Sequence, residues 1–237
     1  MDLKEAQFFS EPDLLEHWYY HSKLRMIEDV ITKNSGPSKY CCDVGAGSGF
    51  FSKNLLEKKL VKNVCCVDPS YDSNNGDEKI LFCKTAPKAF LKKTELALFM
   101  DVLEHVPNDI ELLESYTAEF KPGTKVLITV PAYQFLFGQH DRFLGHYRRY
   151  TRNQLQKVCV LAGLSEIKSF YYFGAVFPIA LFLRSIGLIA DRIQPDRPAT
   201  KSDLKKHSQL TNSVLRAMCF FERKALKNLV PFGLTVF

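Results

Sequence analysis

Three glycines at every second position, Gly45, Gly47 and Gly49, follow a short apolar run and an acidic residue, Asp43. Glycines at this spacing let the backbone turn sharply and present bare N–H groups to a ligand, because no Cβ stands in the way. A helix expected over residues of about 50–59 adds a partial positive charge at its N-terminus. The stretch therefore predicts one wall of a nucleotide-like pocket.

Spacing and charge indicate which nucleotide this wall suits. The dinucleotide fingerprint places its third glycine one residue later, where this chain has Phe50. The Gly-Lys-Ser/Thr ending of a phosphate-binding P-loop is also missing from the sequence. The carboxylate of Asp43 would repel a diphosphate, whereas it would attract a ligand with a cationic end, such as the sulfonium of S-adenosylmethionine.

Two further acidic residues end predicted strands. Asp68 follows a strand at about 63–67, roughly twenty residues after the glycines, where a carboxylate can accept both ribose hydroxyls. An Asp-Pro turn with Pro69 is the alternative interpretation. Asp101 ends a buried strand at about 96–100, which places it at the carboxyl edge of the sheet, facing the same pocket.

These motifs together resemble class I S-adenosylmethionine-dependent methyltransferases, and the run from Phe99 to Asn108 resembles their fourth-strand motif. Residues 16–20 and the loop over 131–151 are similar to a bacterial subgroup linked to envelope glycan or lipid-carrier metabolism. The resemblance implies S-adenosylmethionine as cofactor and S-adenosylhomocysteine as product. It implies that cofactor contacts come from Asp43, Gly45, Ala46, Gly47, Gly49, Asp68, Pro69, Thr85, Ala86, Asp101 and Val102. Members often bind adenine through an acid near position 85, but this chain has Lys84-Thr85-Ala86, so backbone contact is expected instead.

Methyl transfer needs little acid–base help, yet a hydroxyl acceptor benefits from a base, and histidine is the usual choice near neutral pH. The candidates are His105, His140 and His146, with Asp141 as an orienting partner. On the acceptor side we expect contacts from Trp18, Tyr20, Tyr133, Arg148 and Arg149. The two arginines could clamp a phosphate or carboxylate, or could simply be solvated ahead of a helix.

Strand and helix signals alternate after an opening helix at about 11–33. This predicts an α/β fold, with a doubly wound, mostly parallel Rossmann-like sheet of seven strands, the last antiparallel. The connection over residues 69–78 is short and polar, so a loop or single turn is expected there. The expected divisions are a helical cap over 1–36, a cofactor-binding core over 37–173, a two-helix insertion over 174–232, and a final edge strand over 233–237.

Composition limits the remaining possibilities. The chain has 237 residues and a net charge of +6 spread along its length, which does not demand nucleic acid as a partner. Two adjacent cysteine pairs lie in strand-like runs, where neighbours point to opposite faces and cannot share a metal ion; no metal site is predicted. Reduced thiols and the lack of an export signal favour a cytoplasmic protein. The apolar run over 170–190 is long enough to span a bilayer, but Pro178, Gly174, Gly187 and Arg184 favour burial or peripheral contact at the inner membrane face.

The sequence thus predicts an enzyme that methylates a small-molecule or lipid-linked acceptor, such as a sugar hydroxyl. The alternatives are an NAD-type oxidoreductase, a protein that binds the cofactor without turnover, and an RNA methyltransferase. The acceptor and the oligomeric state are not specified by the sequence.

Overall fold

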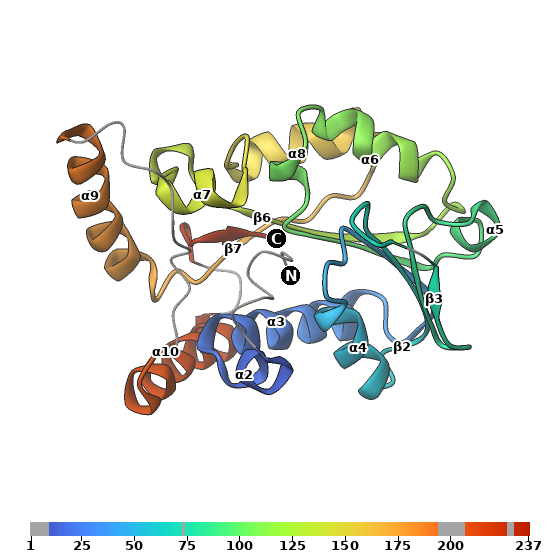
Figure 1. Cartoon of the computed structure of the whole chain (residues 1–237), viewed down its shortest axis with the longest axis horizontal. Helices are drawn as coiled ribbons and strands as arrows, with labels where there is room; N and C mark the ends of the chain where they lie inside the picture. The colour runs from blue at the N-terminus through green and yellow to red at the C-terminus, as the bar shows by residue number, and fades with distance from the viewer. Residues whose placement is uncertain (1–9, 73, 194–206, 227–229) are drawn as a thin grey trace.

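The computed structural model describes residues 10–72, 74–193, 207–226 and 230–237, and at its centre lies a sheet of eight strands (Figure 1). Strands β4, β2, β1, β5 and β6 run parallel in this order, and β8 pairs antiparallel with both β6 and β7. The strands are β1 (Ser38–Val44), β2 (Val61–Val67), β3 (Asn75–Gly76), β4 (Ile80–Cys83), β5 (Leu96–Met100), β6 (Lys125–Pro131), β7 (Tyr171–Tyr172) and β8 (Thr235–Val236). The predicted α/β fold, with its mostly parallel sheet and antiparallel last strand, is confirmed.

Helices cover both faces of this sheet (Figure 1). One layer contains α2 (Glu11–Glu16), α3 (Trp18–Asn34), α4 (Phe50–Glu57) and α10 (Gln209–Phe221). The other contains α6 (Asp109–Thr117), α7 (Gln139–Leu144) and α8 (Arg152–Leu161). The remaining elements are α5 (Lys88–Leu91), α9 (Phe177–Ile193), the short 3-10 turns η1 (Leu103–His105) and η2 (Gln134–Leu136), and the π-helical segment η3 (Glu222–Leu226).

Alternation along the central strands divides the apolar side chains between two cores. Cys41 and Cys66 belong to the core that packs against α3 and α4, whereas Cys42 and Cys65 belong to the core under α6 and α8. All four thiols are buried and free, and burial raises the pKa of each. The two pairs therefore act as small apolar side chains, one on each face, as the strand periodicity predicts.

The structure corrects three expected elements. The opening helix is broken at His17, whose extended backbone separates α2 from α3 and whose Nδ1 accepts the N–H of Tyr19 at 3.3 Å. The polar connection after β2 contains β3, a two-residue strand antiparallel to β4, so the sheet has eight strands and not seven. The final strand, expected at the edge of the sheet over 233–237, is β8 (Thr235–Val236), but it lies between β6 and β7, so the edge strand is β7.

The chain after β6 is held to the edge of the sheet by Tyr150. Its N–H donates to the carbonyl of Pro131 at 2.9 Å, and its carbonyl accepts the N–H of Tyr133 at 2.9 Å. Its buried hydroxyl lies 2.6 Å from Oδ2 of Asp109 and 3.1 Å from the carbonyl of Leu103. Tyr150 thus joins the segment after β6 to the turn that follows β5.

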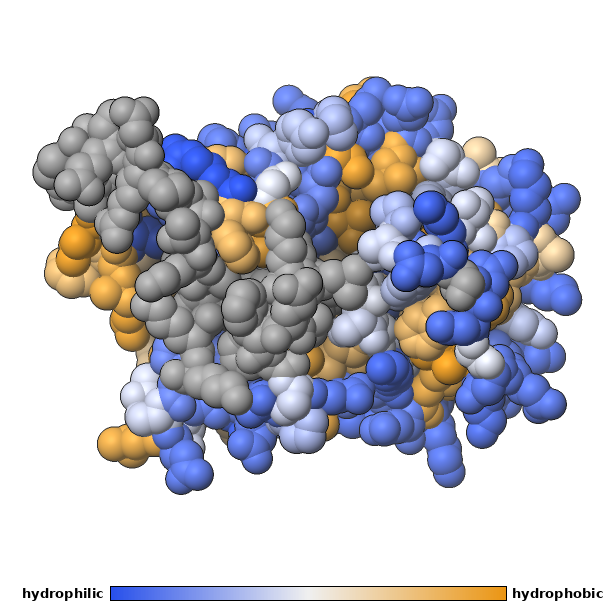
Figure 2. Space-filling view, viewed as in Figure 1, coloured by the Kyte–Doolittle hydropathy of each residue, from blue (hydrophilic) through white to orange (hydrophobic). Residues whose placement is uncertain are grey.

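Apolar side chains gather on the outer surface of α9, at one end of the molecule (Figure 2). Ile179, Phe182, Leu183 and Ile186 are all exposed by 46–65%. In the described ranges, no helix combines the length and the hydropathy that a bilayer crossing requires. Residues 194–206, which belong to the insertion expected over 174–232, lie outside the described residues.

Replacing Tyr150 by Phe should lower the free energy of unfolding by about 1–2 kcal/mol, because a buried hydroxyl partner of Asp109 is lost. Urea denaturation of wild type and Y150F measures the difference. Tyr147→Phe is the matched control, since Tyr147 is 57% exposed and should change stability by less than about 0.5 kcal/mol. Equal midpoints for all three proteins would show that Tyr150 does not tie these segments together.

Candidate functional site

The loop between β1 and α4 carries the three glycines in left-handed conformation. Their φ angles are +68°, +55° and +71° for Gly45, Gly47 and Gly49. A Cβ at Gly45 would stand 2.6 Å from Cγ2 of Val102, and one at Gly49 would stand 2.8 Å from the ring of Phe82. Both the backbone conformation and the close packing therefore require glycine. The contact with Val102 also places the loop directly beside the end of β5.

Asp43 lies beneath this loop, at the end of β1. Its side chain is buried, and Oδ2 accepts a hydrogen bond from Oγ of Ser52 at 2.6 Å. Oδ1 has no hydrogen-bond partner within the described part of the chain. Burial raises the pKa of this carboxyl to about 6, although the Ser52 hydroxyl acts in the opposite direction. The carboxylate is thus poorly neutralised by the protein alone.

Asp68 closes the second side of the loop. Its Oδ2 accepts the N–H of Gly47 at 3.0 Å, and its Oδ1 accepts the N–H of Ser70 at 3.0 Å. Tyr71, which the sequence did not single out, donates its hydroxyl to the carbonyl of Gly47 at 2.6 Å. Pro69 is exposed beside them. The carboxylate is therefore fixed next to the glycines by backbone groups, and no cation is needed to hold it in place.

Asp101 ends β5 in a left-handed conformation, with φ of +55°. Oδ1 accepts the hydroxyl of Thr129 at 3.1 Å, and Oδ2 forms an ion pair with the ammonium of Lys23 from α3. The Lys23 side chain is fully buried, whereas that of Asp101 is 31% exposed. Burial alone would lower the pKa of Lys23, but the charge of Asp101 raises it above its usual value. The ammonium therefore stays charged.

Sequence reasoning missed Lys23. The signal was available, because Lys23 precedes Ile27 by four residues and so falls on the apolar face of the predicted helix. A lysine in that position requires an anionic partner.

Thr85 and Ala86 follow β4, with Thr85 exposed and Ala86 buried. The residues expected to contact a cofactor thus lie at the carboxyl ends of β1, β2, β4 and β5, where parallel sheets bind ligands.

Three histidines cluster where the η1 turn meets α7 and the loop that follows it. The rings of His105 and His146 are edge to face with centroids 4.5 Å apart, and the ring of His140 is 6.5 Å from that of His146. Nδ1 of His146 lies 2.8 Å from Oδ1 of Asp141. The structure thus brings the three candidate histidines together and gives His146 the orienting carboxylate expected from the sequence.

Asp141 and Arg149 form a buried ion pair behind this cluster. Nε and Nη2 of Arg149 donate to the two carboxylate oxygens at 2.7 and 2.9 Å. Burial opposes ionisation of Asp141, but the hydrogen bonds from His146 and Arg149 hold its pKa well below the usual range. The guanidinium of Arg148 meets the carbonyls of Val106 and Pro107 and the carboxylate of Asp109. Both arginines have partners within the protein, so the anion clamp stays a prediction.

Glu104 is a group that sequence reasoning did not select. Its side chain is completely buried, and neither carboxylate oxygen has a hydrogen-bond partner among the described residues. Burial and the charge of Asp101 raise its pKa well above the usual value. Its carbonyl accepts the N–H of Tyr147 at 2.7 Å, which joins the η1 turn to the histidine loop. Its position directly before His105 was the only signal in the sequence.

The aromatic residues expected on the acceptor side form packed clusters. Trp18 meets Phe173 edge to face at 5.7 Å, and Tyr20 is buried against Phe50 at 5.9 Å. Tyr133 stacks on Tyr171 and on Phe135, with centroids 5.1 Å apart in each case. The structure shows these rings packed against one another, and a contact with an acceptor stays a prediction for each of the three expected residues.

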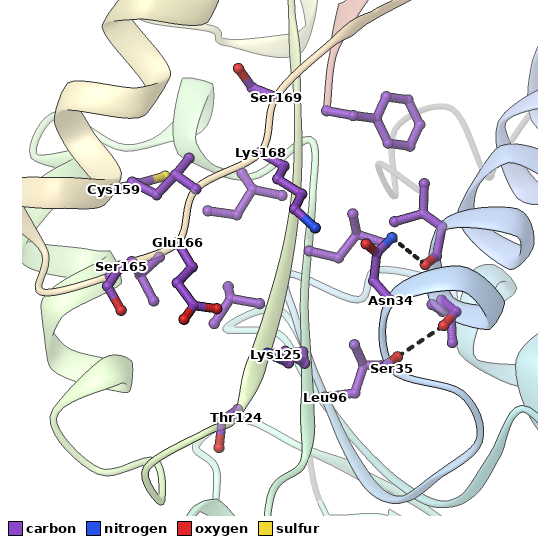
Figure 3. A pocket seen from close by; sticks show the side chains of 18 of the residues that line it. Asn34, Ser35, Leu96, Thr124, Lys125, Cys159, Ser165, Glu166, Lys168 and Ser169 are labelled. Carbon is purple, nitrogen blue, oxygen red and sulfur yellow. Dashed lines mark hydrogen bonds between the residues drawn. The ribbon is translucent and has the colours of Figure 1, made fainter. Parts of the chain in front are cut away.

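A cavity of about 810 Å³ lies elsewhere, at the opposite end of the sheet (Figure 3). Its lining includes the start of β6 at Lys125, the end of α3 at Asn34, and the segment from Ser165 to Ser169 that forms no ladder with β6. None of the residues expected to bind cofactor or acceptor lines this cavity. It is therefore not the candidate site.

Comparison with known proteins agrees with this arrangement. A family model described as a methyltransferase domain matches residues 15–168. No curated protein matches the sequence. The fold is similar to a protein from Bacillus halodurans described as a methyltransferase, with a TM-score of 0.50 and 15% identity, covering 75% of this chain and 86% of that one.

Two other solved structures share the fold. One, from Galdieria sulphuraria and described as a sarcosine dimethylglycine methyltransferase, has a TM-score of 0.51 and 12% identity, covering 91% of this chain and 83% of that one. The other is phosphoethanolamine N-methyltransferase 2 from Haemonchus contortus, solved with S-adenosyl-L-methionine. Its TM-score is 0.50 at 16% identity, and the match covers 97% of this chain but 59% of that one.

Replacing Lys23 by Met should destabilise the fold by about 2 kcal/mol, below the range for a fully buried pair because Asp101 keeps access to water. The double variant Lys23→Met, Asp101→Asn should recover part of this loss, since no unpaired carboxylate remains. Chemical denaturation of the four proteins of the cycle measures the coupling. The control is Lys53→Met, which removes an exposed pair with Glu11 and should cost little. Strictly additive losses would exclude a direct Lys23–Asp101 interaction.

Proposed function

The chain belongs to the methyltransferase domain family, and from that premise we propose that it transfers a methyl group from S-adenosylmethionine to a small-molecule or lipid-linked acceptor, such as a sugar hydroxyl. The observation that carries the proposal is the loop from Asp43 to Gly49. It has no room for Cβ atoms at Gly45 and Gly49, and it is bordered by the carboxylates of Asp43 and Asp68.

The residues of this loop fit the cofactor. S-adenosylmethionine supplies an electrophilic methyl group on a positively charged sulfur. The unpartnered Oδ1 of Asp43 favours a cationic ligand, and both carboxylates would repel a diphosphate. We assign the amino-acid part of the cofactor to Asp43, Gly45, Ala46, Gly47 and Gly49. We assign the ribose to Asp68 and Pro69, the adenine edge to Thr85 and Ala86, and the wall between them to Asp101 and Val102.

The protein's part in methyl transfer is mainly alignment, because the methyl group is already activated by its sulfonium. The aromatic clusters around Trp18, Tyr20 and Tyr133 exclude water from this end of the sheet. His105, His140 and His146 are assigned to the acceptor, whose hydroxyl proton must leave as the new bond forms. Asp141 acts by positioning, because its hydrogen bond with Nδ1 of His146 fixes the orientation of that ring.

Helix α9 supports an acceptor with an apolar part. Nη1 of Arg184 donates to the carbonyl of Leu136 at 2.7 Å and lies 3.6 Å from Oδ2 of Asp141. The exposed apolar surface of α9 is thereby attached to the loop that carries the histidines. A lipid-linked acceptor held at a membrane surface would present its head group to the histidines and its chain to this helix.

S-adenosylhomocysteine should bind the purified protein in a 1:1 complex, and Asp68→Ala should weaken this binding tenfold or more with little loss of stability. The reason is that Asp68 lies beside the glycine loop, where its carboxylate can accept the ribose hydroxyls, while its own partners are only the N–H of Gly47 and the N–H and hydroxyl of Ser70. Isothermal calorimetry measures the affinity. The control is Asp72→Ala, an exposed acid on the same connection, which should bind as wild type does. Binding of NADH in place of S-adenosylhomocysteine would refute the proposal.

The affinity for S-adenosylmethionine should rise between pH 5 and pH 7.5 with a midpoint near the Asp43 pKa of about 6. Below that pH the carboxyl is neutral, and above it the carboxylate attracts the cationic ligand. The free energy of unfolding of the ligand-free protein should fall as the pH rises from about 4 to about 6. The folded protein favours the protonated form of Asp43, whereas in the unfolded chain this carboxyl ionises near pH 3.9. Asp43→Asn should remove both dependences. Calorimetry and thermal unfolding across this range test them, and an unchanged pH profile in D43N would exclude Asp43 as the cause.

A further inference from the structure

We propose that Glu104, His105 and His146 bind a divalent first-row transition-metal ion beside the methyl-transfer site. One ligand atom from each of the three side chains can be chosen so that all lie within 4.8 Å of one another. Two residues come from the η1 turn and the third from the loop after α7, so the fold and not the local sequence brings them together. No metal site was predicted from the sequence, because its adjacent cysteines point to opposite faces of a strand and cannot share an ion.

The burial of Glu104 is the first argument. Its side chain is completely buried with both oxygens unpartnered among the described residues, and an unpaired carboxylate in that position is costly. The neighbouring acids each have a cation: Asp101 has Lys23, and Asp141 has Arg149. Glu104 has no ion pair of its own within the described ranges. A bound cation would supply the missing charge.

The orientation of His146 is the second argument. Its Nδ1 is engaged with Asp141, so Nε2 is the nitrogen left to ligate a metal. Metal-binding histidines regularly donate their other ring N–H to a carboxylate, which fixes the tautomer and strengthens the ligand. Here that carboxylate is itself held at two points by Arg149. Such a supporting shell is what a metal-ligating histidine requires.

The donor set indicates the class of ion. Two imidazoles and one carboxylate suit zinc, cobalt, manganese or iron, whereas magnesium and calcium prefer oxygen donors. Three protein ligands also leave positions open for water or for an acceptor oxygen, as in catalytic metal sites. The site adjoins the candidate cofactor pocket, because η1 directly follows Val102, which packs against Gly45.

This position gives the ion a role in the proposed reaction, and that role rests on the proposed function. An acceptor hydroxyl coordinated to the ion has a lowered pKa and loses its proton to solvent more readily. The oxygen then forms its bond to the methyl carbon as the carbon–sulfur bond breaks, and the sulfonium becomes a neutral thioether. His105 and His146 would thus act through the metal, while His140 stays beside them as the third histidine.

Titration of the chelator-treated full-length protein with Co²⁺, followed by visible absorption, tests the site. We expect saturation at one ion per chain, with affinity falling tenfold or more in Glu104→Gln and His146→Gln. Asp141→Asn should weaken binding roughly tenfold through loss of orientation. The control is His207→Ala, because His207 is an exposed histidine outside the cluster and its removal should leave the titration unchanged.

If a histidine variant folds poorly, Glu104→Gln still tests whether the triad binds the ion. This substitution keeps the shape of the Glu104 side chain and removes its carboxylate. Thermal unfolding of each variant with and without Co²⁺ is the second readout, and only proteins with the intact triad should be stabilised by the ion. Absence of stoichiometric binding to wild type, or equal affinity in E104Q, would overturn the metal site.

Calorimetry with S-adenosylhomocysteine on the same samples separates the two proposals. A protein that binds this ligand but not Co²⁺ loses only the metal site, and one that binds Co²⁺ but not this ligand loses only the proposed function.

Discussion

The carboxyl groups at one edge of the sheet must each be neutralised, and the protein does this differently for each of them. Asp68 is held by backbone N–H groups, Asp101 by Lys23, and Asp141 by Arg149. Asp43 has only a serine hydroxyl, and Glu104 has no partner on its side chain among the described residues. Buried carboxyls without cations raise the free energy of the protein alone and create demand for positive charge. To these two unsatisfied carboxyls, one under the glycine loop and one on η1, we assign the proposed cationic ligands.

This demand also explains how the N-terminal helix is joined to the sheet. Lys23 extends from α3 to the end of β5, and its ammonium is shielded from water there. Because Lys23 pairs with Asp101 at the end of β5, the position of α3 depends on the negative charge of that carboxylate. The same helix carries Trp18 and Tyr20, whose rings pack on Phe173 and Phe50. One helix therefore supplies both the cation that pairs with Asp101 and aromatic rings of the core beside the glycine loop.

Much of this architecture could be predicted from the sequence, because it depends on local patterns. The apolar runs that became β1, β2, β5 and β6 are short and bounded by turn residues, and their alternation with helical segments predicts a parallel sheet. The glycines, Asp68 and Asp101 then fall at the carboxyl ends of strands. What could not be predicted depends on contacts distant in sequence. The ion pair of Lys23 spans 78 residues, and the approach of His146 to Glu104 depends on how residues 131–150 fold back. The break at His17 and the two-residue β3 were missed because they depend on one or two hydrogen bonds each.

The glycine loop, which we assign to the cofactor, and helix α9, which we assign to the acceptor, lie in different parts of the chain. The family match ends at residue 168, and every residue assigned to the cofactor lies within it. Helix α9 lies beyond that limit, yet its Arg184 reaches back to Leu136 and Asp141, which orient the histidine loop. Parallel sheets bind their ligands at strand ends, so the donor side is fixed by the core that all such domains share. We place the proposed acceptor side where α9 meets the loop after β6. Differences in acceptor among related chains should therefore arise from the length and surface of these two segments, while the glycine loop stays the same.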